Sequence, residues 1–122
     1  MNSDLPKLRL FSAAQPEPQH WHAPPERRID GNPRQTAWNH YTDPSGVFSA
    51  GIWEAGPGAW RVVYTEDEYC EILAGCSIVT ADDGTAVTLR AGDRFVVPAG
   101  FAGTWRVVET TRKVYVIHEP RA

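Results

Sequence analysis

From residue 34 onward, hydrophobic and polar residues alternate in short runs, a pattern typical of β-strands that each bury one face. The runs are rich in Val, Ile, Thr, Trp and Tyr, and turn residues such as Gly, Pro and Asp separate them. The pattern predicts strands at residues 35–40, 47–54, 60–65, 69–73, 77–81, 86–90, 94–97, 104–109 and 113–119. Many short strands at regular spacing predict an all-β sandwich or barrel, of which a jelly roll is one form.

The N-terminal part of the chain has a different composition. Six of the ten prolines lie within the first 33 residues, so residues 15–28 are expected to be extended and irregular rather than helical. We therefore predict an extended, Pro-rich N-terminal arm at residues 1–33 and a single β-domain at residues 34–122.

Charge and cysteine content narrow the class of protein. Acidic residues (15) exceed basic residues (12), so no broad cationic face is expected to hold a nucleic acid. No segment approaches the ~20 apolar residues of a membrane span, and no signal peptide is recognisable. Cys70 and Cys76 are too few for a disulfide framework and are expected to be buried, reduced thiols. The sequence thus predicts a cytoplasmic protein without nucleic-acid or membrane partners.

Two glycine-bounded segments have the spacing of a known paired signature. The first is GPGAWRVVYTEDEYCEILAG, from Gly56 to Gly75, and the second is GDRFVVPAGFAGTWRV, from Gly92 to Val107. On these motifs the chain resembles the cupin superfamily. The further segments GIWEAGPGAW, DDGTAVTLRAGDRFVVPAGFAGTW and TRKVYVI make it similar to the small single-domain branch that resembles the cupin domain of (S)-ureidoglycine aminohydrolase. The resemblance implies a cupin jelly-roll β-barrel, of the RmlC-like type, that pairs as a homodimer.

The cupin signature also places metal ligands, and most of them are replaced here. Val62 and Tyr64 stand where the first motif has histidines, and Gly103 stands where the second motif has one. Glu68 keeps its place as the acidic ligand. We therefore predict a degenerate site with no metal cofactor. The alternative is a divalent metal held by Glu68 with non-standard ligands such as Glu66.

The resemblance implies that these ligand positions point into the barrel, and strand alternation adds the aromatic residues on the same faces. The result is a pocket lined mainly by aromatic side chains, with one carboxylate. The expected ligand-binding residues are Trp60, Val62, Trp105, Cys70 and Trp53. The tryptophans could instead fill the volume that loss of a metal leaves, and core packing is the favoured role for Trp53 and Cys70.

Glu68 and Tyr64 are the predicted catalytic residues. A carboxylate in an apolar barrel is desolvated, which favours its protonated form and suits it to general acid/base catalysis. Tyr64 could donate a hydrogen bond beside it. The alternatives are a Glu68 at the barrel rim, either solvated or paired with an arginine, and a Tyr64 that only fills the core. His20 and His22, in the arm, are expected to be exposed rather than metal ligands.

Three functions fit these observations. The favoured one is a barrel pocket without the usual metal-binding histidines that binds or transforms a small polar metabolite. If the chain is an enzyme, a lyase, isomerase or hydrolase is expected, with Glu68 as general acid/base. The alternatives are a metal-dependent hydrolase resembling ureidoglycine aminohydrolase, and a non-catalytic module that self-associates or binds a partner through a solidly packed barrel. A homodimer is expected in all three.

Overall fold

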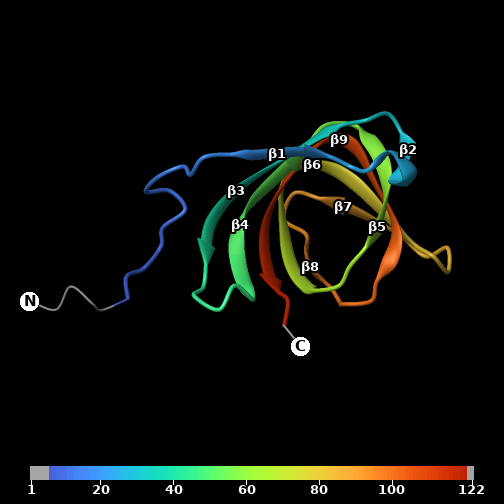
Figure 1. Ribbon diagram of the computed structural model, residues 1–122. Helices are drawn as coiled ribbons and strands as arrows, with labels where there is room; N and C mark the ends of the chain where they lie inside the picture. The colour runs from blue at the N-terminus through green and yellow to red at the C-terminus, as the bar shows by residue number, and fades with distance from the viewer. Residues whose placement is uncertain (1–5, 121–122) are drawn as a thin grey trace, which may run out of the picture.

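The fold is a single curled antiparallel sheet. The computed structural model describes residues 6–120. Its elements are β1 (Gln19–His22), a 3-10 helix η1 (Pro25–Arg27), β2 (Arg28–Asp30), β3 (Arg34–Thr42), β4 (Phe48–Ala55), β5 (Gly58–Val63), β6 (Asp67–Ala81), β7 (Ala86–Arg90), β8 (Arg94–Val97) and β9 (Ala102–His118). Figure 1 looks along the axis about which the sheet curls. The predicted all-β class is confirmed.

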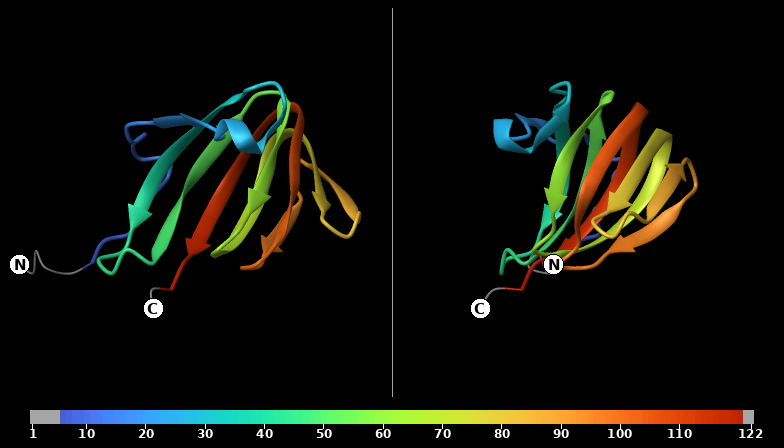
Figure 2. Two further views of the ribbon diagram at one scale, coloured as in Figure 1. Left: turned by 45° about the vertical axis from the view of Figure 1, so that its right-hand side comes forward. Right: turned by 90° about the vertical axis from the view of Figure 1, so that its right-hand side faces the viewer.

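Strand β9 holds the sheet together. The strands follow the order β1-β3-β4-β9-β5-β2, and β6 pairs with β7, β8 and β9. On one side of β9, the N-terminal half pairs with β5 and the C-terminal half pairs with β4. β6 pairs with β9 along most of the length of β9. Figure 2 shows β9, in red and orange, between these neighbours. Because one long strand bonds to three others, the sheet closes into a jelly-roll barrel.

Strands β6 and β9 are each longer than the sequence pattern predicted. Each merges two predicted strands, whereas β7 and β8 have the predicted bounds. Register shifts between Ile72 and Ser77 let β6 bend without losing its pairing with β9. Gly75 lies in this bend with φ at +87°, and a Cβ there would overlap the carbonyl of Thr110. The bulge thus joins the two strands that the sequence pattern predicted at residues 69–73 and 77–81.

Residues 19–30, here called the strap, cross between two strands of the sheet (Figure 1). β1 pairs with the first residues of β3, and β2 pairs with Ala59 and Trp60 of β5. Nε of Arg28 donates to the carbonyl of Ala23 at 2.9 Å, and Asp30 forms an ion pair with Arg106 at 2.9 Å. The sequence pattern missed both short strands. The predicted division of the chain after residue 33 stays a prediction.

The core lies inside the barrel and is built around three tryptophans. The ring of Trp53 packs against Trp60 and Trp105, with centroid distances of 6.2 and 5.7 Å. All three rings are buried, as is Ile72 beside them. This packing fills one part of the barrel and leaves the part beneath the strap open.

Two predictions from composition concern cysteines and membranes. Cys70 and Cys76 are buried free thiols, as predicted. Across residues 6–120, no helix has the length and hydrophobicity needed to cross a membrane. The cytoplasmic location stays a prediction.

Candidate functional site

An open cavity of about 680 Å³ lies inside the barrel and extends to the strap. Trp53, Trp60, Trp105, Tyr64 and Tyr115 provide most of its aromatic lining. The interior is therefore not packed solid. The non-catalytic alternative would require a solidly packed barrel.

The structure brings the predicted site residues together. Six of the seven border the cavity: Trp53, Trp60, Val62, Tyr64, Glu68 and Trp105. The seventh, Cys70, is buried and contacts Glu68 directly. Strand alternation therefore predicted the inward faces correctly, and the functional roles of these residues stay predictions.

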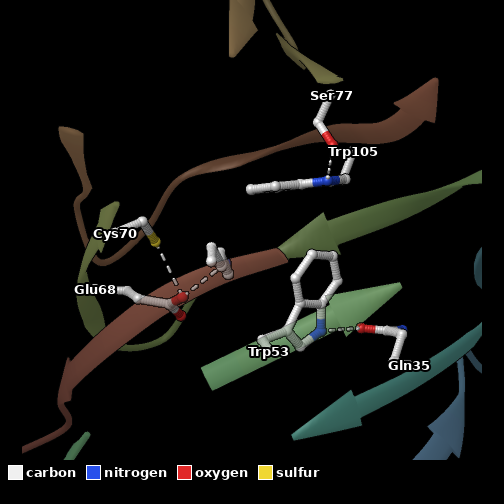
Figure 3. A network of polar contacts seen from close by, with 7 residues as sticks. Gln35, Trp53, Glu68, Cys70, Ser77 and Trp105 are labelled. Carbon is white, nitrogen blue, oxygen red and sulfur yellow. Dashed lines mark hydrogen bonds and ion pairs between the residues drawn. The ribbon is translucent and has the colours of Figure 1, made fainter. Parts of the chain in front are cut away.

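The polar centre of the cavity is an ion pair that the sequence analysis missed. Nζ of Lys113, on β9, lies 2.8 Å from Oε2 of Glu68, on β6. The two side chains are only 6% and 7% exposed. The Sγ of Cys70 donates to the same carboxylate oxygen at 3.2 Å (Figure 3). Glu68 is therefore neither an isolated carboxylate nor a solvated one at the rim.

Two tryptophans flank the ammonium group of Lys113. Its Nζ lies 4.9 Å from the ring centroid of Trp53 and 4.5 Å from that of Trp105, within the range of cation–π attraction. A hydrogen bond from the indole N–H fixes each ring (Figure 3). Trp53 donates to Gln35 Oε1 at 3.2 Å, and Trp105 donates to Ser77 Oγ at 3.1 Å. The ammonium thus sits in a rigid aromatic setting.

The protonation states follow from burial and from this pair. Burial alone would lower the pKa of Lys113, but the charge of Glu68 outweighs it and the pKa is raised. Burial raises the pKa of Cys70 to about 12, and it also raises the pKa of Tyr64 well above its usual value. At neutral pH the cavity therefore presents an ammonium group, a neutral thiol and a neutral phenol. Neither Lys113 nor Cys70 is in the form that acts as a nucleophile.

The residues at the cupin metal positions do not fit a divalent metal. Val62 offers no donor atom, and Tyr64 is a neutral phenol. At Gly103 a Cβ would overlap the carbonyl of Thr80, so no side chain could reach the cavity from there without a backbone shift. A metal bound at Glu68 would also meet the positive charge of Lys113. Among the described residues, no three His, Cys, Asp or Glu side chains are grouped as metal ligands.

The two histidines of the arm lie on β1, whose residues are all exposed, as predicted. Nδ1 of His20 contacts Oγ1 of Thr36 at 2.9 Å, and Nδ1 of His22 donates to the carbonyl of Asn32 at 3.2 Å. Trp21, between them, borders the cavity instead. Neither histidine lines the cavity that Glu68 borders.

Lys113 could have been found from one signal. It alternates with Thr111 and Tyr115, and all three are buried on the inner face of β9. A lysine in such an alternation indicates a buried charge that needs a partner. Its partner lies 45 positions earlier in the chain and becomes evident only when β6 and β9 are paired.

Comparison with known proteins gives a family and related structures. Residues 42–115 match the EutQ-like cupin domain, and no curated protein matches the chain. A DUF861-family protein of unknown function from Pseudomonas syringae pv. tomato has a TM-score of 0.76 at 21% identity, covering 86% of this chain and 45% of its own. The EutQ protein of Clostridium difficile has a TM-score of 0.64 at 19% identity, covering 71% of this chain and 64% of its own. A DUF861-family protein from Thermotoga maritima is 36% identical, with a TM-score of 0.52, over 52% of this chain and 73% of its own.

These comparisons agree with the predicted superfamily. The chain spans less than two thirds of the length of the Pseudomonas and Clostridium proteins, and at these identities they show the fold alone. The closer resemblance to ureidoglycine aminohydrolase stays a prediction. Because the family match covers well over half of the sequence, the chain belongs to the EutQ-like cupin domain family.

Proposed function

We propose that the chain binds a small polar metabolite in the barrel cavity, with the Lys113–Glu68 pair as the polar centre of the site. The observation that carries this proposal is a buried ion pair bordering an open cavity of about 680 Å³. Cavities of this size with aromatic walls and a few converging polar groups are the usual form of small-molecule sites.

The energetics of the pair support a role in binding. Removing two charges from water costs several kcal/mol per ion, and apolar residues of similar volume are often at least as stable. Stability alone therefore gives little reason for an ammonium and a carboxylate at 6% and 7% exposure. Binding of a ligand that uses these charges would explain why they are buried here. Charged groups in clefts are also enriched at functional sites.

The pair also changes the role expected of Glu68. The carboxylate holds Lys113 in its charged form, and the ammonium can stabilise negative charge on a carbonyl or carboxylate oxygen of the metabolite. Tyr64, as a neutral phenol, can donate a hydrogen bond to the same molecule. If the metabolite is transformed, Lys113 would stabilise the developing charge while Glu68 accepts or returns a proton. Such chemistry suits a lyase, an isomerase or a hydrolase.

The metal-dependent alternative has less support. It would require a cation at Glu68 in competition with Lys113, and the positions of Val62 and Gly103 supply no ligand. The metabolite pocket needs no rearrangement of these residues.

A thermal-shift screen of a broad metabolite library tests the proposal. Val62 borders the cavity, so Val62→Trp should fill part of it, whereas Val108, 47% exposed on β9, provides the control Val108→Trp. Compounds that bind should raise the melting temperature of the wild type and of Val108→Trp but not of Val62→Trp. A ligand at a hundred times its Kd adds about 2.7 kcal/mol of stability, which such a screen detects. A screen without hits, or hits that persist in Val62→Trp, would contradict the proposal.

A further inference from the structure

We infer that the metabolite is a small carboxylate that also carries a hydrogen-bond donor, bound with its donor at Glu68 and its carboxylate at Arg27 of the strap. This inference rests on the proposed function and names the class of ligand.

The first observation is the free oxygen of Glu68. Lys113 and Cys70 both donate to Oε2, and Figure 3 shows the other carboxylate oxygen without a dashed line. Oε1 receives no hydrogen bond from any residue between 6 and 120. In the same part of the chain no fully buried side-chain oxygen or nitrogen lacks a partner, so Oε1 has accessible surface facing the cavity. A carboxylate oxygen only accepts, and the ligand must therefore bring an N–H or O–H group.

The second observation is that two residues at the cavity carry hydrogen-bond donors, in contrast to the acceptor oxygen of Glu68. Tyr64 and Trp60 border the cavity, and no hydrogen bond joins the hydroxyl of Tyr64 or the indole N–H of Trp60 to another described residue. The indole N–H can only donate. The ligand is thus expected to carry acceptor oxygens as well as its donor.

The third observation is Arg27. It lies on the strap, borders the cavity and forms no ion pair with any residue of the described part of the chain. Arg61 also borders the cavity, but both of its terminal nitrogens bind Asp82. The strap is anchored at both ends by strand pairing, which keeps Arg27 at the cavity wall. A planar guanidinium with free donors matches the two oxygens of a carboxylate.

The ion pairs around the cavity leave one arginine available to a ligand. Among the charged residues that border the cavity, Arg61 is paired with Asp82 and Lys113 with Glu68. Arg27 and Glu66 also border it, and neither forms an ion pair with a described residue. Arg27 is therefore the cation at the cavity wall that a carboxylate can bind without breaking an existing pair.

Three related probes separate the parts of this inference. Mandelate has an aromatic ring, a hydroxyl and a carboxylate; phenylacetate lacks the hydroxyl, and methyl mandelate lacks the charge. Binding can be followed by NMR through the indole N–H signals, with that of Trp60 assigned from Trp60→Phe. Mandelate should shift this signal, and phenylacetate should bind about tenfold more weakly, since a hydrogen bond to a charged group is lost.

Variants of arginine test the carboxylate contact. Arg27→Gln should weaken the binding of mandelate about threefold, as expected for a partly exposed ion pair. It should leave the affinity for methyl mandelate unchanged. Arg90 is exposed on β7 and does not border the cavity, so Arg90→Gln is the control for net charge. It should leave the affinity for mandelate unchanged.

The outcomes distinguish this inference from the proposed function. If methyl mandelate binds as tightly as mandelate, or if Arg27→Gln weakens both equally, the ligand class is wrong while the cavity remains a binding site. The inference also fails if none of the probes shifts the Trp60 signal although library hits depend on Val62. If the library gives no hits either, both proposals fail.

Discussion

Replacing Lys113 by Met should leave the carboxylate of Glu68 buried without its counter-ion. In the wild type the two groups lie 2.8 Å apart, and the side chain of Glu68 is 7% exposed. After the change, among the described residues, only the thiol of Cys70 still donates to this carboxylate. Breaking a buried ion pair from one side costs about 3–5 kcal/mol, and we expect a loss of unfolding free energy in this range at neutral pH.

The double variant Lys113→Met with Glu68→Gln separates the charge effect from packing. Methionine has a similar length, and an uncharged amide requires much less solvation than a carboxylate. We therefore expect the double variant to recover to within about 1 kcal/mol of the wild type.

Urea unfolding followed by tryptophan fluorescence measures all of these free energies, since five tryptophans are available. The double-mutant cycle gives the coupling between the two side chains directly. A single variant within about 1 kcal/mol of the wild type, or a double variant no more stable than the single one, would refute the reasoning.

Three further predictions concern the backbone, pH and assembly. Gly84→Ala should cost roughly 1–2 kcal/mol of unfolding free energy, because alanine is strained at the positive φ of this residue. Gly75→Ala should cost clearly more, because Gly75 also has a positive φ and in addition lacks room for a Cβ. Chemical unfolding of the two variants measures both losses. The pKa of Cys70 is raised from 9.0 to about 12, so its neutral thiol contributes stability that is complete below about pH 9 and is lost as the pH rises toward 12. The fall in unfolding free energy across this window should be shallower in Cys70→Ala, and an equal slope would contradict it. We expect light scattering to give the mass of a homodimer. Tyr69 and Val96 are exposed cross-strand partners on the outer face, and we expect this face to form the dimer contact. Val96→Lys should therefore yield monomers.

Local patterns predicted the strands and their inward faces well. The strands at residues 86–90 and 94–97 have the predicted bounds, because turn residues flank both of them. The faces of Trp60 and Trp105 follow from alternation, which needs no knowledge of the strand's neighbours. These are properties of single segments, and a sequence shows them directly.

Features that depend on pairing between distant segments were missed. The role of Glu68 depends on Lys113, and their contact arises from the register between β6 and β9. Near Lys113 each face of β9 carries polar or charged residues, Thr111 and Lys113 on one and Arg112 on the other, so which face is inward becomes clear only from the pairing with β6. The bend at Gly75 likewise looked like the end of a strand, because a bulge and a turn use the same residue type.

The strap has a consequence for the solution behaviour of the chain. It occupies backbone hydrogen-bonding groups at Arg34–Ala37 of β3 and at Ala59 and Trp60 of β5. A chain shortened to begin at residue 34 would leave these N–H and C=O groups open on two strands, which is how sheets of separate molecules join edge to edge. The N-terminal segment is therefore expected to protect the protein from aggregation, and shortened forms should precipitate where the full chain stays dispersed.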